Sequence, residues 1–246
     1  MDLQTYTLAS EVEDKHWWFR GRRSVLRALL DRHLRGAPQA RDILEVGCGN
    51  GGNLALLSRY GNLFAVELDD AARARAVQRG QATIEAGQLP GALPFAGQRF
   101  DLIAALDVLE HIEDDEASLR ALRGRLKPGG QVLLTVPAYP WMWGPNDRVA
   151  HHVRRYSRND FRSLIARSGF APEYLGHFNT LLFPLAVAQV KLGPMLRADR
   201  HAGLRIPPRP LNRLLEGLFS LERFIVPRFA LPYGLSLVAV ARAGRD

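Results

Sequence analysis

The sequence has a single cysteine, Cys48, among its 246 residues. One cysteine cannot form an internal disulfide or a cysteine-based zinc site, and it fits a protein of a reducing compartment. Residues 1–15 are polar and acidic and lack an apolar core, so we expect no secretory signal peptide. The sequence therefore excludes the class of small secreted proteins that disulfides stabilise.

The chain also lacks a long apolar run. The longest uncharged stretch, residues 174–190, contains His177, Asn179 and Pro184. It is shorter than the roughly 20 apolar residues that cross a bilayer as a helix. We expect a cytoplasmic protein, with peripheral contact at the inner face of the membrane as an open alternative.

Lysine is scarce, so arginine carries nearly all of the positive charge. The formal net charge of +8 is uneven: residues 1–147 hold 17 basic and 19 acidic residues, whereas residues 148–246 hold 16 and 6. Arginine binds planar anions through two parallel hydrogen bonds. The C-terminal excess indicates either an anionic partner or simply an arginine-rich composition, and the sequence leaves both open.

Short apolar runs alternate with helical patterns through a composition that is globular, 47% hydrophobic and 24% charged. This alternation predicts an α/β fold whose parallel sheet is covered by helices on both faces. We predict strands at 42–46, 63–67, 82–86, 100–106, 131–136, 171–179 and 235–242. We predict helices at 51–60, 70–79, 114–126 and, after the capping residue Ser157, up to 167, with a turn at 127–130.

The segment between the last two predicted strands does not fit this alternation. It contains an apolar stretch at 181–196, a basic, proline-rich loop at 198–210 and an amphipathic helix at 211–225. The apolar stripe of that helix comprises Leu211, Leu214, Leu215, Leu218, Phe219 and Ile225. We interpret the segment as an insertion.

The sharpest motif is an apolar strand that runs into alternating glycines and then a helix, at residues 43–51. Glycines at the end of a strand let a ligand approach the backbone, next to a helix N-terminus. The G-x-G-x-G spacing differs from the G-x-G-x-x-G of pyrophosphate binders, which disfavours NAD and FAD. Glu67, at the end of the next strand, is placed to accept both hydroxyls of a ribose.

Taken together, the motifs resemble those of the class I S-adenosylmethionine-dependent methyltransferases. They are Glu45-x-Gly47-x-Gly49-x-Gly51, Glu67, Leu93-Pro94-Phe95 before Phe100-Asp101, Asp107-Val-Leu-Glu-His111 and Leu126-Lys-Pro-Gly-Gly130. The resemblance covers residues 42–170 and the final strand, and it is most similar to the branch that contains ubiquinone and menaquinone biosynthesis methyltransferases. It implies a Rossmann-like, seven-stranded, doubly wound sheet, with S-adenosylmethionine as cofactor and S-adenosylhomocysteine as product.

The resemblance also implies a division of the chain into parts. Residues 1–41 would form an N-terminal helical lid, 42–180 the cofactor-binding core, and 233–246 the final core strand and tail. Residues 181–232 would be a helical, basic and apolar insertion that covers the substrate or contacts a membrane. Packing on the domain's own core is the alternative for this insertion.

Several residues take cofactor-binding roles by this resemblance. Gly47, Gly49 and Gly51 would pass under the methionyl part, Glu45 would orient that loop or bind near the amino group, and Glu67 would hold the ribose. Relatives often have an Asp beside the adenine, where this sequence has Gln88. The full predicted set is Arg23, Glu45, Gly47, Cys48, Gly49, Gly51, Glu67, Leu68, Gln88, Leu89, Asp107 and Val108. Cys48 is expected to be a small packing residue, and Arg22 is an alternative to Arg23 as partner of the methionyl carboxylate.

The catalytic and acceptor-binding candidates follow the fourth and fifth strands. His111 is either a general base or a helix-start residue that packs under the cofactor, and the other catalytic candidates are Asp107, His151 and His152. The predicted substrate contacts are Trp18, Tyr139, Trp143, Arg154, Arg155 and Tyr156. No carboxylate or cysteine stands at a ligand spacing from the adjacent histidines, so we predict no metal site.

These features predict methyl transfer to an oxygen, nitrogen or carbon atom of a small, anionic or amphiphilic acceptor such as a lipid, a quinone or a lipid-linked intermediate. The alternatives are a nucleic-acid (RNA) methyltransferase and a non-catalytic S-adenosylmethionine-binding protein. The sequence lacks the motifs of base amino methylation and a catalytic cysteine, which disfavours nucleic acid as a partner. It leaves a monomer and a homodimer open.

Overall fold

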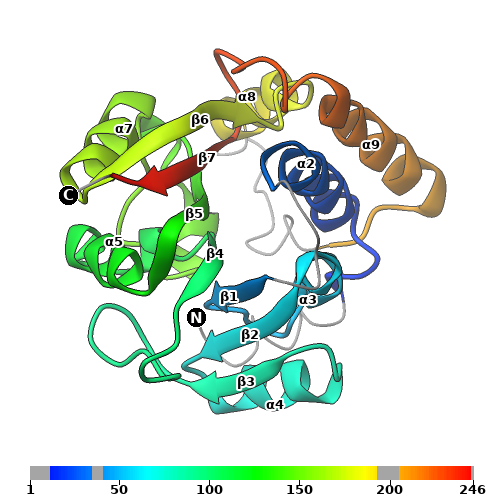
Figure 1. Ribbon diagram of the computed structural model, residues 1–246. Helices are drawn as coiled ribbons and strands as arrows, with labels where there is room; N and C mark the ends of the chain where they lie inside the picture. Colours follow the sequence, from blue (N-terminus) through cyan, green and yellow to red (C-terminus); the bar gives the residue numbers. More distant parts are fainter. Residues whose placement is uncertain (1–11, 35–40, 193–204, 245–246) are drawn as a thin grey trace.

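The computed structural model describes residues 12–34, 41–192 and 205–244 (Figure 1). Its strands are β1 Asp42–Val46, β2 Asn62–Glu67, β3 Thr83–Ala86, β4 Phe100–Leu106, β5 Leu126–Pro137, β6 Phe170–Phe178 and β7 Ser236–Ala243. Its α-helices are α2 Trp17–His33, α3 Leu54–Leu57, α4 Asp70–Gln78, α5 Asp115–Gly124, α6 Pro145–Val149, α7 Arg158–Arg167, α8 Phe183–Leu192 and α9 Arg209–Leu221. Short 3₁₀ turns are η2 Ser58–Tyr60, η3 Leu109–His111, η4 Pro140–Met142 and η7 Glu222–Phe224.

The strands form one seven-stranded sheet in the order β3-β2-β1-β4-β5-β7-β6. β7 runs antiparallel to β5 and β6, and the remaining neighbours are parallel. The sheet grows outward in both directions from β1 and β4, and ligands of such sheets bind at the carboxyl ends of the strands at this point. The predicted α/β, seven-stranded, doubly wound fold is confirmed.

Two hydrophobic layers cover the faces of the sheet, with helices on both sides (Figure 1). Successive side chains of a strand point to opposite faces, so Leu44 packs into the layer under α5 and α7 while Ile43 packs into the layer under α2 and α3. Both residues are almost fully buried. The central strands therefore read as continuous apolar runs, as expected for a sheet covered on both faces.

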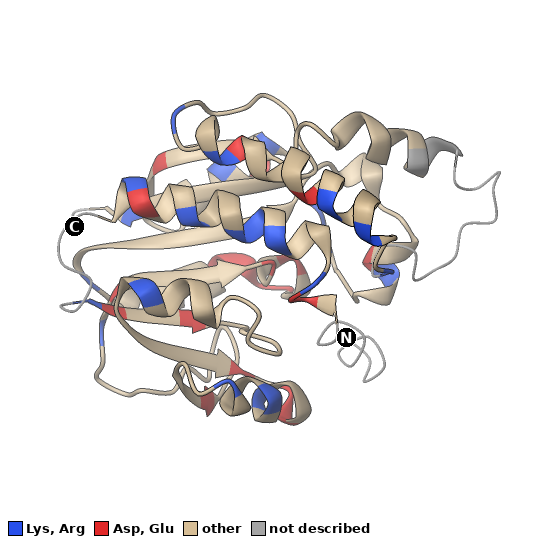
Figure 2. Cartoon of the chain, turned by 90° about the vertical axis from the view of Figure 1, so that its right-hand side faces the viewer, with Lys and Arg blue, Asp and Glu red and all other residues tan. Residues whose placement is uncertain are grey.

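The insertion between β6 and β7 contains α8, α9 and η7, and α9 lies beside α2 (Figures 1 and 2). A Cβ atom at Gly21 of α2 would lie 2.6 Å from the Phe219 ring, so the missing side chain lets the two helices approach closely. Phe219 is fully buried, whereas Leu211 and Leu214 of the same predicted stripe are 47% and 59% exposed. The predicted stripe is therefore only partly core. Most of the predicted loop at 198–210 lies outside the described residues.

Two local predictions are wrong. The predicted helix at 51–60 is only the short α3 followed by η2, because the glycine-rich residues before Leu54 form turns. The predicted turn at 127–130 belongs to β5, which begins at Leu126 and carries an irregularity opposite Phe100, with Gly129 at a φ of +77°. No helix in the described ranges is long and apolar enough to span a membrane.

Candidate active site

The glycine loop follows β1 directly and adopts left-handed backbone conformations. Gly47, Gly49 and Gly51 have φ values of +70°, +55° and +83°, a region that L side chains rarely adopt. A Cβ atom at Gly47 would also lie 2.7 Å from Val108. A Cβ atom at Gly49 would meet no atom within 4 Å, so open space lies next to this glycine. The loop thus offers bare backbone to a ligand.

Glu67, at the end of β2, joins this loop to the next one. Its Oε2 accepts the Gly49 N–H at 2.7 Å, and its Oε1 accepts the Asp69 N–H at 2.9 Å. The residue is 5% exposed. Because each carboxylate oxygen can accept more than one hydrogen bond, the side chain keeps acceptor capacity for a ligand.

A cavity of about 770 Å³ lies above these strand ends. Ten of the predicted cofactor residues line it: Arg23, Gly47, Cys48, Gly49, Glu67, Leu68, Gln88, Leu89, Asp107 and Val108. Glu45 and Gly51 do not. Trp18, His111 and His152 also line it, which brings cofactor, substrate and catalytic candidates to one place. Pockets of this size hold ordinary cofactors and small ligands.

An ion pair fixes Asp107, which has a left-handed backbone with φ of +58°. Arg22 is 4% exposed, and its Nη2 lies 2.8 Å from Asp107 Oδ2 and donates to Thr135 Oγ1 at 2.8 Å. Thr135 in turn donates to Asp107 Oδ1 at 2.9 Å. Both Arg22 and Arg23 line the cavity, but Arg22 is paired with Asp107, whereas Arg23 donates only to backbone oxygens among the contacts described.

Glu45 lies behind the glycine loop and is 1% exposed. Its Oε1 accepts a hydrogen bond from Asn53 at 2.9 Å, but its buried Oε2 has no hydrogen-bond partner. Burial raises the pKa of the Glu45 carboxyl to about 8, although Asn53 and the charge of Arg22 oppose the rise. A cationic ligand group nearby would favour the ionised form.

Cys48 is 5% exposed, and burial, followed by the charges of Glu45 and Glu67, raises the pKa of its thiol. The thiol therefore stays protonated, which agrees with the packing role predicted for it.

Four predicted substrate contacts have structural partners instead of a place on the cavity wall. Tyr139 stacks on His177, Arg154 pairs with Asp115 and Glu113, Arg155 pairs with Asp147, and Tyr156 is buried and donates to Asp115. Trp143 is 37% exposed and, like the exposed His151, does not line the cavity. Of the predicted substrate contacts, only Trp18 lines it.

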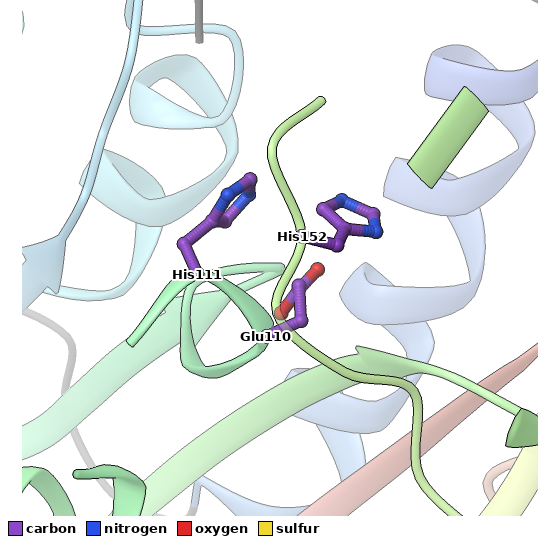
Figure 3. Close-up of side chains that lie close together, drawn as sticks. All are labelled: Glu110, His111 and His152. Carbon is purple, nitrogen blue, oxygen red and sulfur yellow. The ribbon is translucent and has the colours of Figure 1, made fainter. Parts of the chain in front are cut away.

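Glu110, His111 and His152 come together, and the two histidines line the cavity (Figure 3). One ligand atom from each lies within 4.8 Å of the other two. Burial, and then the charge of His152, lowers the pKa of His111 to about 4, so its ring is neutral near pH 7. Burial, and then the charge of Asp107, raises the pKa of Glu110 well above its usual range.

Sequence reasoning missed several residues of the cavity wall. Asn146, Val149 and Ala150 come from α6 and the residue after it, and Glu13 comes from the turn before α2. Tyr139 and Trp143, before α6, were the predicted contacts, but α6 and the residue after it line the cavity instead. A proline at the first position of that helix, Pro145, is the one signal that predicts its start.

Comparison with known proteins decides the family. The family described as "Methyltransferase domain" matches residues 18–175, which is well over half of the chain. The chain belongs to this methyltransferase family. The predicted membership among the class I S-adenosylmethionine-dependent methyltransferases, and the predicted cofactor, are confirmed.

Curated relatives of this chain align with it over part of their length. The ubiquinone biosynthesis O-methyltransferase of Acinetobacter baylyi is 31% identical over 139 residues, which cover 52% of this chain and 58% of the relative. The protein with the same name from Pseudomonas aeruginosa strain UCBPP-PA14 is 34% identical over 111 residues, 41% and 46% of the two chains. The chain thus spans about half the length of the curated relatives it matches.

Solved structures share the fold over nearly the whole chain. A chain from the complex between the Haloferax volcanii Trm112 methyltransferase activator and a methyltransferase has a TM-score of 0.61 at 18% identity, covering 97% of this chain and 95% of that one. The magnesium protoporphyrin IX methyltransferase of Synechocystis with bound S-adenosylhomocysteine has a TM-score of 0.56 at 13% identity, covering 92% and 83%. At these identities the likeness is one of fold.

The cavity and the buried Glu45 carboxyl behind its glycine loop fit S-adenosylmethionine. The open space at Gly49 admits a ligand against the backbone, and Glu67 keeps acceptor capacity beside it. The buried, unpartnered Oε2 of Glu45 suits a cationic amino group. These acceptor groups therefore match a ligand that carries a ribose and an ammonium group, both of which donate hydrogen bonds.

Proposed function

We propose that this protein transfers a methyl group from S-adenosylmethionine to a small-molecule acceptor. One observation carries the proposal. Residues of the glycine loop and Glu67 line the same cavity as Trp18, Asp107 and His111. One part of the wall has the groups that hold a cofactor, and another offers an aromatic ring, a carboxylate and an imidazole to an acceptor.

The chain's own residues would hold the cofactor by contacts of known type. Glu67 would accept hydrogen bonds from the ribose hydroxyls, Glu45 would attract the ammonium group, and Arg23 would pair with the carboxylate. S-adenosylmethionine, when bound, supplies an electrophilic methyl group on a sulfonium. The protein then mainly has to hold the acceptor in line and exclude water, because proximity and orientation account for much of the rate.

Aromatic residues of the N-terminal region are suited to excluding water. Trp18 and Phe19 line the cavity and pack edge to face with ring centroids 4.9 Å apart. The Arg22 guanidinium lies 5.3 Å from the Trp18 ring centroid, so the same arginine that binds Asp107 also holds this ring. We infer that the start of α2 is the lid predicted from the sequence.

An oxygen atom of a quinone-type or lipid-linked acceptor is the target we propose. The curated relatives that match are named for O-methylation in ubiquinone biosynthesis, and the cavity wall combines Trp18 and Ile112 with histidine nitrogens. The experiment is incubation of lipid and metabolite extracts with labelled S-adenosylmethionine, followed by identification of the product. Label in a lipid-soluble phenol or quinone supports the proposal, and label in nucleic acid alone contradicts it.

We also propose that the insertion contacts an anionic membrane surface. Six apolar residues on and after α9, which we call the α9 patch, are 41–66% exposed: Leu211, Leu214, Leu221, Phe224, Ile225 and Phe229. Arg213, Arg223 and Arg228 are interspersed with them, and basic residues outnumber acidic ones along α2 and α9 (Figure 2). Exposed apolar side chains among arginines are typical of interfacial contact with anionic lipid.

Vesicle sedimentation tests this contact. We expect the protein to sediment with vesicles that contain phosphatidylglycerol and not with purely phosphatidylcholine vesicles. The double variant Leu214→Asp, Phe229→Asp should lose this binding, whereas Val77→Asp, at a valine that is 53% exposed on α4, should keep it. Binding that the double variant retains contradicts the proposal. A wild-type homodimer that the double variant dissociates in light scattering would show that a second copy covers the patch instead.

A further inference from the structure

Three side chains with metal-ligating atoms converge on the cavity wall. Glu110 and His111 belong to η3, after β4, and His152 comes from the loop after α6 (Figure 3). A ligand atom of each lies within 4.8 Å of the other two, and both histidines line the cavity. The two segments are about forty residues apart in sequence, so linear spacing does not reveal the group.

Glu110 is buried, and the part of the chain that the structure describes offers no hydrogen bond to its carboxyl group. The residue is 1% exposed, and neither Oε1 nor Oε2 has a hydrogen-bond partner. Its carboxylate lies close beneath His152, with the His111 ring facing them (Figure 3). A buried carboxylate without a donor is unfavourable, and a cation beside it removes that penalty.

One ring nitrogen of His152 is held by a carboxylate, an arrangement that is common among metal-ligating histidines. Its Nδ1 lies 2.9 Å from Asp147 Oδ1, which leaves Nε2 as the free ring nitrogen. Asp147 is 1% exposed and is itself held by Arg155 Nε at 2.7 Å and the Gly144 N–H at 2.8 Å. A carboxylate that fixes one nitrogen of a histidine makes the other a better and better-placed ligand.

We propose that Glu110, His111 and His152 bind a divalent transition-metal ion, in place of the metal-free site predicted from the sequence. Two imidazoles and one carboxylate suit Zn²⁺ or Fe²⁺ rather than Mg²⁺, which prefers oxygen ligands. Three protein ligands leave a coordination position open, as in catalytic metal sites.

The open position would face the cavity, because His111 and His152 line it. Its ligand would be an oxygen atom of the acceptor, and this part rests on the proposed methyl transfer. A metal ion lowers the pKa of a bound hydroxyl, so the acceptor oxygen would release its proton to solvent and become a nucleophile at neutral pH. His111 and His152 would then act as ligands and not as general bases.

Metal binding can be measured without any turnover. Metal-free, tag-free protein is dialysed against Zn²⁺ and counted by elemental analysis, and Co²⁺ loading is followed by its visible absorption. We expect one equivalent of metal per chain in the wild type. His111→Ala and His152→Ala should each weaken binding at least tenfold, and Asp147→Asn should weaken it by about 10–100-fold.

His151→Ala is the matched control, because this exposed histidine is adjacent to His152 but is not in the cluster. Its affinity for Zn²⁺ should equal that of the wild type. The proposal is overturned if the wild type binds no stoichiometric metal, or if His151→Ala loses as much affinity as His152→Ala. Calorimetry of S-adenosylhomocysteine on the same metal-free protein separates this failure from failure of the proposed function, because cofactor binding does not need the metal ligands.

Discussion

Replacing Gly49 with alanine tests whether open space next to the glycine loop is the cofactor's place. Gly49 has φ of +55°, and a Cβ atom there meets no protein atom within 4 Å. Gly80, after α4, matches it closely, with φ of +64° and again nothing within 4 Å. Of these two glycines, Gly49 lines the cavity and Gly80 does not. The pair therefore separates backbone strain from an effect on the ligand.

The two variants should lose similar stability. A left-handed alanine costs about 1–2 kcal/mol relative to glycine, so urea denaturation should show that loss for both Gly49→Ala and Gly80→Ala. Only Gly49→Ala places a methyl group where the cofactor should pass. Overpacking by one methyl group costs about 1–3 kcal/mol, which corresponds to about 5–150-fold in affinity for S-adenosylhomocysteine.

Isothermal titration calorimetry with S-adenosylhomocysteine gives the affinities. We expect Gly80→Ala to bind like the wild type and Gly49→Ala to bind at least about fivefold more weakly. Wild-type affinity in Gly49→Ala would refute the placement of the cofactor against this loop. An equal loss of affinity in both variants would also refute the reasoning, since backbone strain or a general loss of structure would then explain it.

Three further predictions follow from buried charges. Arg22→Met should destabilise the fold by about 2–3 kcal/mol in urea denaturation, since it leaves the partly exposed Asp107 without its cation. The control Arg20→Met, at a half-exposed ion pair, should cost less than about 1 kcal/mol. Equal losses of stability in the two variants would contradict this. The pKa of Glu45 is about 8, and an ammonium ligand favours its ionised form, so binding should release a proton. The affinity for S-adenosylhomocysteine should therefore fall by about 20-fold when the pH is lowered from about 7.5 to 6. Glu45→Gln should remove this pH dependence. A flat wild-type profile would show that Glu45 does not sense the ligand. Glu222→Ala should lower the free energy of unfolding by about 3 kcal/mol, because this fully buried carboxylate accepts hydrogen bonds from three backbone N–H groups at 2.6–2.9 Å. A loss below about 1 kcal/mol would count against that role.

The part of the cavity wall proposed to hold the cofactor could be predicted from the sequence, because its residues stand in short motifs at the ends of two predicted strands. A buried strand that ends in alternating glycines, and a second strand that ends in Glu67, must bring their ends together in a parallel sheet. The structure confirms this with the hydrogen bond from the Gly49 N–H to Glu67. Glu45 was identified by the same motif, although it lies behind the cavity wall and does not line it.

The acceptor half could not be predicted in the same way, because its residues have partners from distant segments. Arg154 and Arg155 look like free anion-binding groups in the sequence, yet they pair with Asp115 and Asp147. Glu110 is only part of a motif in the sequence, yet tertiary packing leaves it buried beside His152. Ion pairs and packing across the sheet depend on which segments meet, and residue spacing alone does not contain that information.

Calorimetry of S-adenosylhomocysteine with the wild type and Glu67→Gln tests the central claim most directly. The account predicts one binding site per chain in the wild type. It also predicts at least about a tenfold loss in Glu67→Gln, since a charge-assisted hydrogen bond to a ligand contributes about 1.5–3 kcal/mol. A wild type that binds no S-adenosylhomocysteine, or a Glu67→Gln variant that binds it as tightly as the wild type, would contradict the account.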